Sequence, residues 1–274
     1  MLKQRIITGL ILAPLVALGV LELPTPYFAL VAAVVMLIGA WEWAALSGLQ
    51  EVVPRIVYVG FIALGLWLVS QVPRGSDTLY YFMLAALVWW GGVFVRLWRF
   101  RGQERLEGFS VVQAIEGAAV LLPPWVALVG LHWMTQQGPG WVMFLLFMIW
   151  TADGGAYFAG RAWGRTKLAP RVSPGKTREG VYGALAGVLA LALAAGFYLD
   201  FSAWRLVGFV VLCLVTTLFS IVGDLFESMI KRQRGVKDSG ALLPGHGGML
   251  DRIDSVTAAS PVFLFGMMTG GFLS

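Results

Sequence analysis

Long apolar runs separated by short polar connections repeat along almost the whole chain. A helix that crosses a bilayer needs about 20 mostly apolar residues, and runs of this length recur from end to end. We therefore expect an all-α polytopic integral membrane protein with about nine transmembrane helices. Their expected positions are 6–23, 27–48, 56–72, 78–98, 112–134, 140–160, 180–199, 204–229 and 255–273. Pro123 and Pro124 interrupt the fifth run, which is expected to be kinked or partly re-entrant.

Composition supports the same class. Of 274 residues, 58% are hydrophobic and only 13% are charged, and the mean hydropathy is +0.78, all far from the values of soluble domains. No internal repeat or low-complexity linker divides the chain. Residues 1–274 are thus expected to form a single membrane domain.

The basic residues are distributed unevenly between the two ends of the expected spans. Of the 20 Lys and Arg residues, only Arg74 and Arg205 fall on one side. Cytoplasmic connections carry the excess of basic residues, so we expect a cytoplasmic N-terminus and a C-terminus on the opposite side. This topology accounts for the net charge of +5 without a nucleic-acid partner.

The first of two charged cytoplasmic loops covers 161–179. It follows Asp153, a carboxylate inside an apolar run, which is a candidate functional residue because ionisable groups at membrane depth are costly. Six basic side chains alternate with glycines in this region. Such a segment either surrounds a polyphosphate or faces anionic lipid headgroups, and both alternatives stay open here. It is not a P-loop, because SPGKT lacks the first glycine of that motif.

The second loop covers 230–254, and polar residues precede it inside the eighth run. On a helix these residues fall at i, i+3, i+4 and i+7 and share one face: Asp224, Glu227, Ser228 and Lys231. Further on, Asp251 and Asp254 stand three residues apart around Arg252. Carboxylates together with phosphate oxygens and water form a Mg²⁺ site, and cations offset the charge of phosphoryl or nucleotidyl transfer. The cations nearby are Lys231, Arg232 and Lys237.

Glu42 raises the same question as Asp153, since it lies between Trp41 and Trp43 in an apolar run. It either reaches the interface or pairs with a neighbouring helix, or it has a function. Tryptophans near the ends of the expected spans are interpreted as interfacial anchors: Trp41, Trp43, Trp98, Trp133, Trp141 and Trp204.

The segment KRQRGVKDSGALLPGHGGMLDRID resembles the signature of phosphatidate cytidylyltransferases, or CDP-diacylglycerol synthases. The fixed positions are all met, by Ser228, Lys231, Arg232, Lys237, Asp238, Gly240, Pro244, His246, Gly247, Gly248, Asp251, Arg252 and Asp254. The segments GDLFES, AYFAGR and SPGKT are also similar. The chain departs from the family at Gly154, where a hydroxyl residue is common, and at Arg178, where an aromatic is common. The resemblance covers roughly 141–274, with the catalytic helices and both loops, whereas 1–140 are similar only in hydrophobicity.

The resemblance implies that CTP and phosphatidate are joined to give CDP-diacylglycerol and pyrophosphate in phospholipid biosynthesis. The catalytic residues would be Asp224, Lys231, Lys237, Asp251, Arg252 and Asp254. The substrate-binding residues would be Ser173, Lys176, Thr177, Ser228, Arg232, Asp238, His246, Gly247 and Gly248. The family uses Mg²⁺, here on Asp224, Asp251 and Asp254 with Asp153 as a further candidate, and a monovalent cation such as K⁺ is a second expected ion.

The expected partners are CTP, phosphatidate and bilayer lipid, with the site on the cytoplasmic side of a bacterial inner membrane. Gly183 and Gly187 have the GxxxG spacing of close helix packing, either within one subunit or in a homodimer. Two alternatives to the cytidylyltransferase are a CTP-dependent lipid or polyprenol kinase and a transporter of an anionic lipid or nucleotide conjugate. The concentration of charge in loops on one side favours interfacial chemistry over transport.

Overall fold

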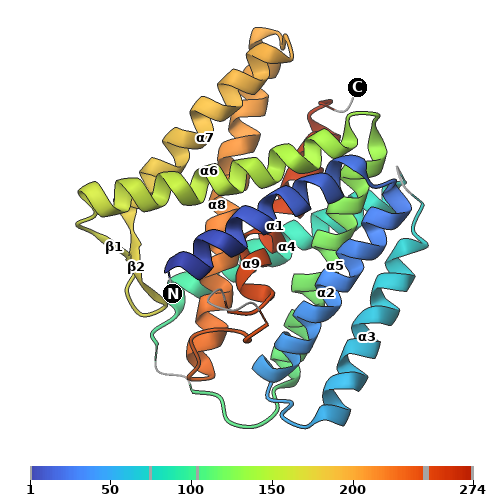
Figure 1. The fold of residues 1–274 in the computed structure, drawn as a ribbon, viewed down its shortest axis with the longest axis vertical. Coiled ribbons are helices and arrows are strands. Elements are labelled where there is room, and N and C mark those ends of the chain that lie inside the picture. Colours follow the sequence, from blue (N-terminus) through green and yellow to red (C-terminus); the bar gives the residue numbers. More distant parts are fainter. Residues whose placement is uncertain (1, 74–75, 103–104, 243–246, 273–274) are drawn as a thin grey trace.

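The computed structural model describes residues 2–73, 76–102, 105–242 and 247–272. These ranges hold nine helices and one small sheet (Figure 1). The helices are α1 (Leu2–Glu22), α2 (Thr25–Leu46), α3 (Val52–Ser70), α4 (Asp77–Arg99), α5 (Val111–Met134), α6 (Gly138–Trp163), α7 (Arg178–Tyr198), α8 (Ala203–Gln233) and α9 (Leu250–Thr269). The strands are β1 (Lys167–Ala169) and β2 (Ser173–Thr177).

The expected polytopic helical fold is confirmed. Each predicted run coincides with one helix to within a few residues. Seven helices of the described chain, α2 to α8, are long and apolar enough to cross a membrane. The chain is therefore an integral membrane protein, because such helices hydrogen-bond their own backbone polar groups, as the interior of a bilayer requires. The orientation of its two ends stays a prediction.

Helix α5 lies in the middle of the bundle, against α2, α3, α6 and α9. It continues without a break through Pro123 and Pro124. The structure thus excludes the re-entrant alternative. Both prolines are buried, and close packing by neighbouring helices is the setting in which a membrane helix tolerates proline.

Helices α6 and α7 make the most extensive helix contact in the protein. A Cβ atom at Gly183 would lie 2.5 Å from the carbonyl oxygen of Gly155, so glycine is needed where the two backbones meet. Gly187 also faces α6, where a Cβ would lie 3.3 Å from the Thr151 methyl group. The GxxxG spacing therefore serves packing inside the subunit, and the homodimer stays a prediction without support from this motif.

The first charged loop is shorter and more ordered than expected. Helix α6 continues to Trp163, and β1 and β2 then form an antiparallel hairpin in which Lys167 pairs with Thr177 and Ala169 with Ser173. The hydroxyl oxygen of Thr177 accepts a hydrogen bond from Gly180 N at 3.1 Å and caps α7. Runs of three and five residues are too short to show a strand period in sequence, so the hairpin was not predicted.

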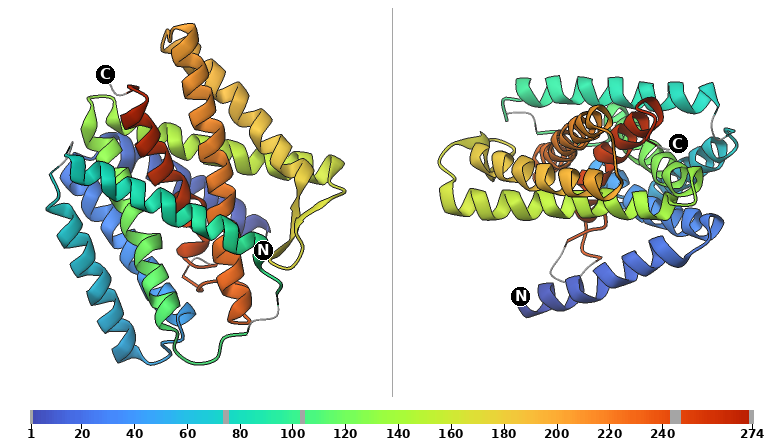
Figure 2. Two further views of the ribbon diagram at one scale, coloured as in Figure 1. Left: turned by 180° about the vertical axis from the view of Figure 1, so that it is seen from behind. Right: turned by 90° about the horizontal axis from the view of Figure 1, so that it is seen from above.

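The polar connections gather at one end of the bundle. The α2–α3, α4–α5 and α8–α9 connections lie at the lower end of Figure 1, whereas the α7–α8 turn and the C-terminus lie at the upper end. Figure 2 shows the same arrangement from behind, with the hairpin beside α8. Arg234, just after α8, fastens this end by donating to the carbonyl oxygens of Leu46 at 2.6 Å and Gly108 at 2.7 Å.

The tryptophan interpretation is partly wrong. Trp41, Trp98, Trp133 and Trp204 are exposed, as anchors are, but Trp43 and Trp141 are buried. The Trp43 indole donates to the Gln113 carbonyl at 2.6 Å and stacks on Phe226. A buried Trp needs such a partner for its N–H, and a linear sequence does not reveal it.

Candidate active site

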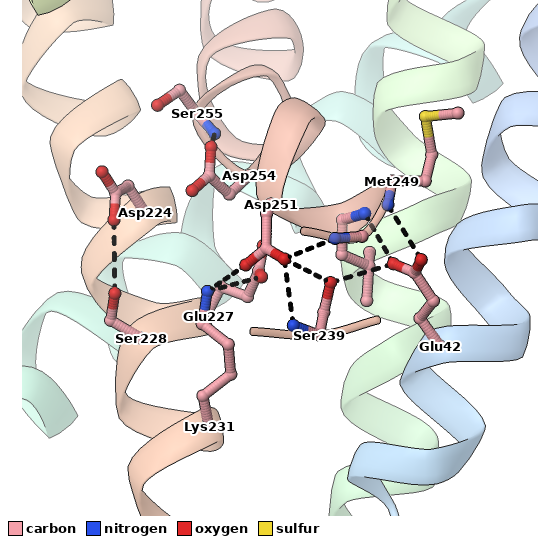
Figure 3. A network of polar contacts seen from close by, with 12 residues as sticks. Glu42, Asp224, Glu227, Ser228, Lys231, Ser239, Met249, Asp251, Asp254 and Ser255 are labelled. Carbon is pink, nitrogen blue, oxygen red and sulfur yellow. Dashed lines mark hydrogen bonds and ion pairs between the residues drawn. The ribbon is translucent and has the colours of Figure 1, made fainter. Parts of the chain in front are cut away.

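Lys231 lies at the centre of a buried ionic group between α8 and α9. Its Nζ is 2.5 Å from Oδ1 of Asp251 and 3.0 Å from Oε1 of Glu227 (Figure 3). The three side chains are between 4% and 10% exposed. Lys231 is therefore held between two carboxylates, and removing its ammonium would leave both of them buried without a compensating charge.

The second oxygen of Asp251 holds the signature segment. Oδ2 accepts hydrogen bonds from Ser239 N at 3.0 Å, Ser239 Oγ at 3.0 Å and Gly248 N at 2.8 Å. Gly247 has a φ of +80°, and a Cβ there would lie 2.5 Å from the same Oδ2. Glycine is therefore required where the loop turns around the carboxylate. Both oxygens of Asp251 are occupied by protein groups.

Asp224 and Asp254 lie on α8 and α9 at a place where the two helices approach closely (Figure 3). A Cβ at Gly223 would lie 2.5 Å from the carbonyl oxygen of Asp254, so glycine lets the two helices approach. Oδ1 of Asp254 accepts from Ser255 N at 2.6 Å. Asp224 accepts from Ser228 Oγ at 3.3 Å and pairs with Lys176 Nζ at 2.6 Å. The hairpin thus brings its lysine to Asp224, in the C-terminal half of α8.

A cavity of about 340 Å³ opens beside this ion pair, between α6, α7, α8 and the hairpin. Its polar wall carries Asp153, Tyr157, Arg161 and Lys176, and Arg161 donates to the Tyr157 hydroxyl at 3.0 Å. The rest of the wall is small or apolar, with Ala152, Ala156, Gly160, Gly180, Val181 and Ile221 among its residues. The cavity therefore has both a charged and an apolar surface.

Sequence reasoning did not single out Tyr157 and Arg161 as site residues. Asp153, Tyr157 and Arg161 follow one another at four-residue intervals. This spacing places them on one helix face. That periodicity was a usable signal, but without the fold it did not indicate that the face lines a cavity.

The other predicted site residues divide into three groups. Arg232 ties the hairpin to α8 by donating to the Val172 carbonyl at 3.3 Å, Ser173 begins β2, and Thr177 is occupied as a helix cap. Lys237, Asp238 and Arg252 are exposed at the same end of the protein. His246 lies outside the described residues.

The expected carboxylates do not form one ready-made metal centre. Among the described residues, no three Asp, Glu, His or Cys side chains are arranged as a metal-binding group. Mg²⁺ usually takes one or two protein carboxylates and completes its shell with water and substrate phosphate. Asp224 and Asp254 lie on facing helices and would fit that requirement with Lys176 displaced from Asp224, whereas Asp251 is engaged by Lys231 and by three donors of the loop.

Comparison with known proteins places this geometry in context. A sequence model described as "Cytidylyltransferase family" matches residues 3–269. A protein of Pseudomonas aeruginosa named phosphatidate cytidylyltransferase is 43% identical over 266 residues, which cover 96% of each chain. A protein of the same name from Haemophilus influenzae is 38% identical and covers 97% of this chain and 98% of its own. One from Brucella suis is 36% identical over 82% of this chain and 72% of its own.

Proposed function

Because this chain belongs to the cytidylyltransferase family, we propose that it joins CTP and phosphatidate to give CDP-diacylglycerol and pyrophosphate. The observation that carries this proposal is the similarity over nearly the full length to relatives named phosphatidate cytidylyltransferase. The complete signature in the sequence agrees with it, and Lys231 and Asp251 of that signature lie in contact. One substrate is soluble and the other is a lipid, which fits a site at the polar end of a helical bundle.

The reaction is an in-line substitution at the α-phosphorus of CTP. A phosphate oxygen of phosphatidate forms the new P–O bond, and the bond from the α-phosphorus to the oxygen that bridges to the β-phosphorus breaks. The bridging oxygen leaves with pyrophosphate. Phosphatidate is already anionic, so no strong general base is needed. The protein contributes mainly positioning and cations.

The cavity beside Lys176 is suited to the phosphate groups of the substrates. Lys176 and Arg161 supply positive charge at its polar wall. The small apolar residues opposite leave room for the glycerol and the first carbons of a lipid. The exposed cations Lys237 and Arg252 lie on the signature side and are proposed to hold the triphosphate.

We propose Asp224 and Asp254 as the residues that hold Mg²⁺, with Asp153 at the cavity wall as a further candidate and K⁺ as a second ion. When bound, Mg²⁺ would neutralise phosphate charge and polarise the reacting phosphorus. Asp251 differs from these carboxylates, because it fixes Lys231 and the loop. Its role is to orient rather than to bind metal.

The protein is proposed to lie in a bacterial inner membrane with this site in the cytoplasm. The bacterial relatives and the excess of basic residues at one end support this placement. It also puts the site where CTP is made available.

The test uses purified protein, phosphatidate in mixed micelles, Mg²⁺ and CTP labelled either in the cytosine ring or in the γ-phosphate. We expect ring label to enter the lipid fraction together with release of pyrophosphate, and no γ-label in lipid. Transfer of γ-label alone would identify a kinase. Absence of both labels from lipid, with CTP unconsumed, would overturn the proposal and favour a transporter.

A further inference from the structure

Glu42 is a buried carboxylate on α2, far in sequence from the signature, and only 5% of it is exposed. Its Oε1 accepts a hydrogen bond from Met249 N at 2.9 Å, and its Oε2 accepts one from Leu250 N at 2.9 Å. Ser239 Oγ lies 2.9 Å from the same Oε2 (Figure 3). Among the described residues, the carboxylate of α2 therefore has its partners at Ser239 and at the start of α9.

Two of these partners are the first backbone amides of α9. The N-cap position of that helix is Met249, whose side chain makes no capping hydrogen bond. The first amides of a helix need acceptors and attract negative charge. Glu42 satisfies both needs from another helix, and thereby fixes where α9 begins and how its first turn is oriented.

The glycines of the signature fit around this carboxylate. A Cβ at Gly240 would lie 2.5 Å from Oε1 of Glu42, and one at Gly248 would overlap Oε2. Side chains at either position would push the loop away from α2. Close approach to Glu42 thus accounts for two signature glycines in physical terms.

Ser239 connects Glu42 to the ionic group of the site. Its hydroxyl lies within hydrogen-bond distance of Glu42 Oε2 at 2.9 Å and of Asp251 Oδ2 at 3.0 Å. A hydroxyl carries one proton, so the two carboxylates share it. Asp251 in turn holds Lys231. A displacement at Glu42 would reach Lys231 through Ser239 and through the first turn of α9.

We propose that Glu42 is a positioning residue for the nucleotidyl transfer, acting on Lys231 and Asp251 through Ser239 and the α9 N-terminus. The expected loss of turnover rests on the proposed function. The expected change at the start of α9 rests on the hydrogen bonds alone. Glu42 belongs to the N-terminal half, which the signature does not reach. Its proposed role involves no contact with substrate.

The variant Glu42→Gln tests this role. Glutamine keeps the size but replaces one acceptor oxygen with an amide that faces N–H donors. We expect kcat/KM for CTP to fall by about 10- to 100-fold, as is typical of residues that orient the binding groups without contacting the ligand themselves. The matched control is Glu116→Gln on α5, a buried carboxylate that pairs with Arg96 and lies outside this network. It is expected to lower thermal stability similarly while kcat/KM changes less than threefold, on the order of experimental scatter.

A double-mutant cycle separates positioning from general stability. If Glu42 acts through Ser239, then Glu42→Gln combined with Ser239→Ala should lose little more than Glu42→Gln alone, whereas Glu116→Gln with Ser239→Ala should show independent losses. Fully multiplicative losses in the first pair would contradict the proposal. So would turnover at the wild-type rate in folded Glu42→Gln protein.

Hydrogen exchange supplies a test that needs no activity. The amides of Met249 and Leu250 are expected to exchange faster in Glu42→Gln than in wild type, with no change in Glu116→Gln. Unchanged exchange would overturn the structural part of the proposal. If the wild-type protein failed to label lipid, the proposed function would be wrong. The exchange result would still test whether Glu42 holds the start of α9. Glu42→Asp, one methylene shorter, is the second variant if Glu42→Gln does not fold.

Discussion

Lys231 Nζ lies 2.5 Å from Asp251 Oδ1 and joins the last turns of α8 to the first turn of α9. Both side chains are about nine-tenths buried. The neighbouring Glu227 carboxylate, at 3.0 Å, shares the same ammonium. The site is therefore organised around one fixed cation whose place depends on its acidic partners.

Asp251→Asn should remove most turnover while leaving the protein folded. Asparagine removes the negative charge that pairs with Lys231. Its amide group would also face a donor, either the Lys231 ammonium or the N–H and O–H groups of Ser239 and Gly248. We expect kcat to fall by about 10- to 100-fold or more, measured as ring label entering lipid. Asp200→Asn is the matched control, because Asp200 is exposed in the α7–α8 turn with a φ of 52°, which asparagine also adopts. Equal turnover in the two variants would contradict the assignment.

Removal of Mg²⁺ should stop the reaction, and the two proposed metal carboxylates should control its return. After treatment with EDTA, titration with Mg²⁺ is expected to restore wild-type activity. Asp224→Asn and Asp254→Asn should need at least about 10-fold more Mg²⁺ for half-maximal rate. Asp251→Asn should lower the maximal rate without shifting this midpoint. If the Mg²⁺ concentration for half-maximal rate rose in Asp251→Asn alone, Asp251 and not Asp224 or Asp254 would be assigned as the metal ligand.

Gly223→Ala should force α8 and α9 apart. The added methyl group would lie 2.5 Å from the Asp254 carbonyl oxygen and 3.1 Å from the Ala258 Cβ. Overpacking of this kind costs about 1–3 kcal/mol, so thermal unfolding in detergent should shift down and activity should fall. Gly208→Ala on the same helix would approach, within the part of the chain that the structure describes, only Phe272 at 3.4 Å and should behave as wild type. Equal unfolding temperatures would show that the helices relax without cost.

Thr177, which was predicted to bind substrate, caps α7 in the structure, and substitutions there distinguish the two roles. Its hydroxyl caps α7, so Thr177→Ala should lose about 1 kcal/mol of stability. Thr177→Ser and Thr177→Asn keep a capping oxygen and should retain most of it. If Thr177 bound substrate instead, Thr177→Asn would keep its unfolding temperature but lose kcat/KM. Paired thermal and kinetic measurements on the three variants decide between the two roles.

Much of the fold was predictable because apolar runs of bilayer length have few alternatives. The runs around Pro123 and Gly183 became helices at the expected places. Short strands have no comparable pattern, so the hairpin that carries Lys176 was not foreseen. Trp43 was misplaced at the interface because its partner, the Gln113 carbonyl, is distant in sequence.

Which carboxylates and cations lie together between α8 and α9 was predictable from the sequence, but what each of them contacts was not. Helical spacing and the signature pointed to Asp224, Lys231, Asp251 and Asp254. Spacing alone did not reveal that Asp251 is occupied by Ser239 and Gly248. Such distinctions depend on which backbone amides surround a carboxylate, and these come from the loop conformation.

The hydrogen bonds from Met249 and Leu250 to Glu42 have a consequence for biosynthesis. The acceptor and its donors are 207 and 208 residues apart. During translation α2 enters the membrane long before α9 is synthesised. Until then, the Glu42 carboxylate must be solvated by water, contact lipid headgroups or pack against another helix. The site can assemble only when the last helix is delivered. A chain truncated before α9 would contain α2 to α8 but would lack the site. Its Glu42 carboxylate would have lost the two amides that bind it in the folded protein, which would make the truncated chain a target for quality-control proteolysis.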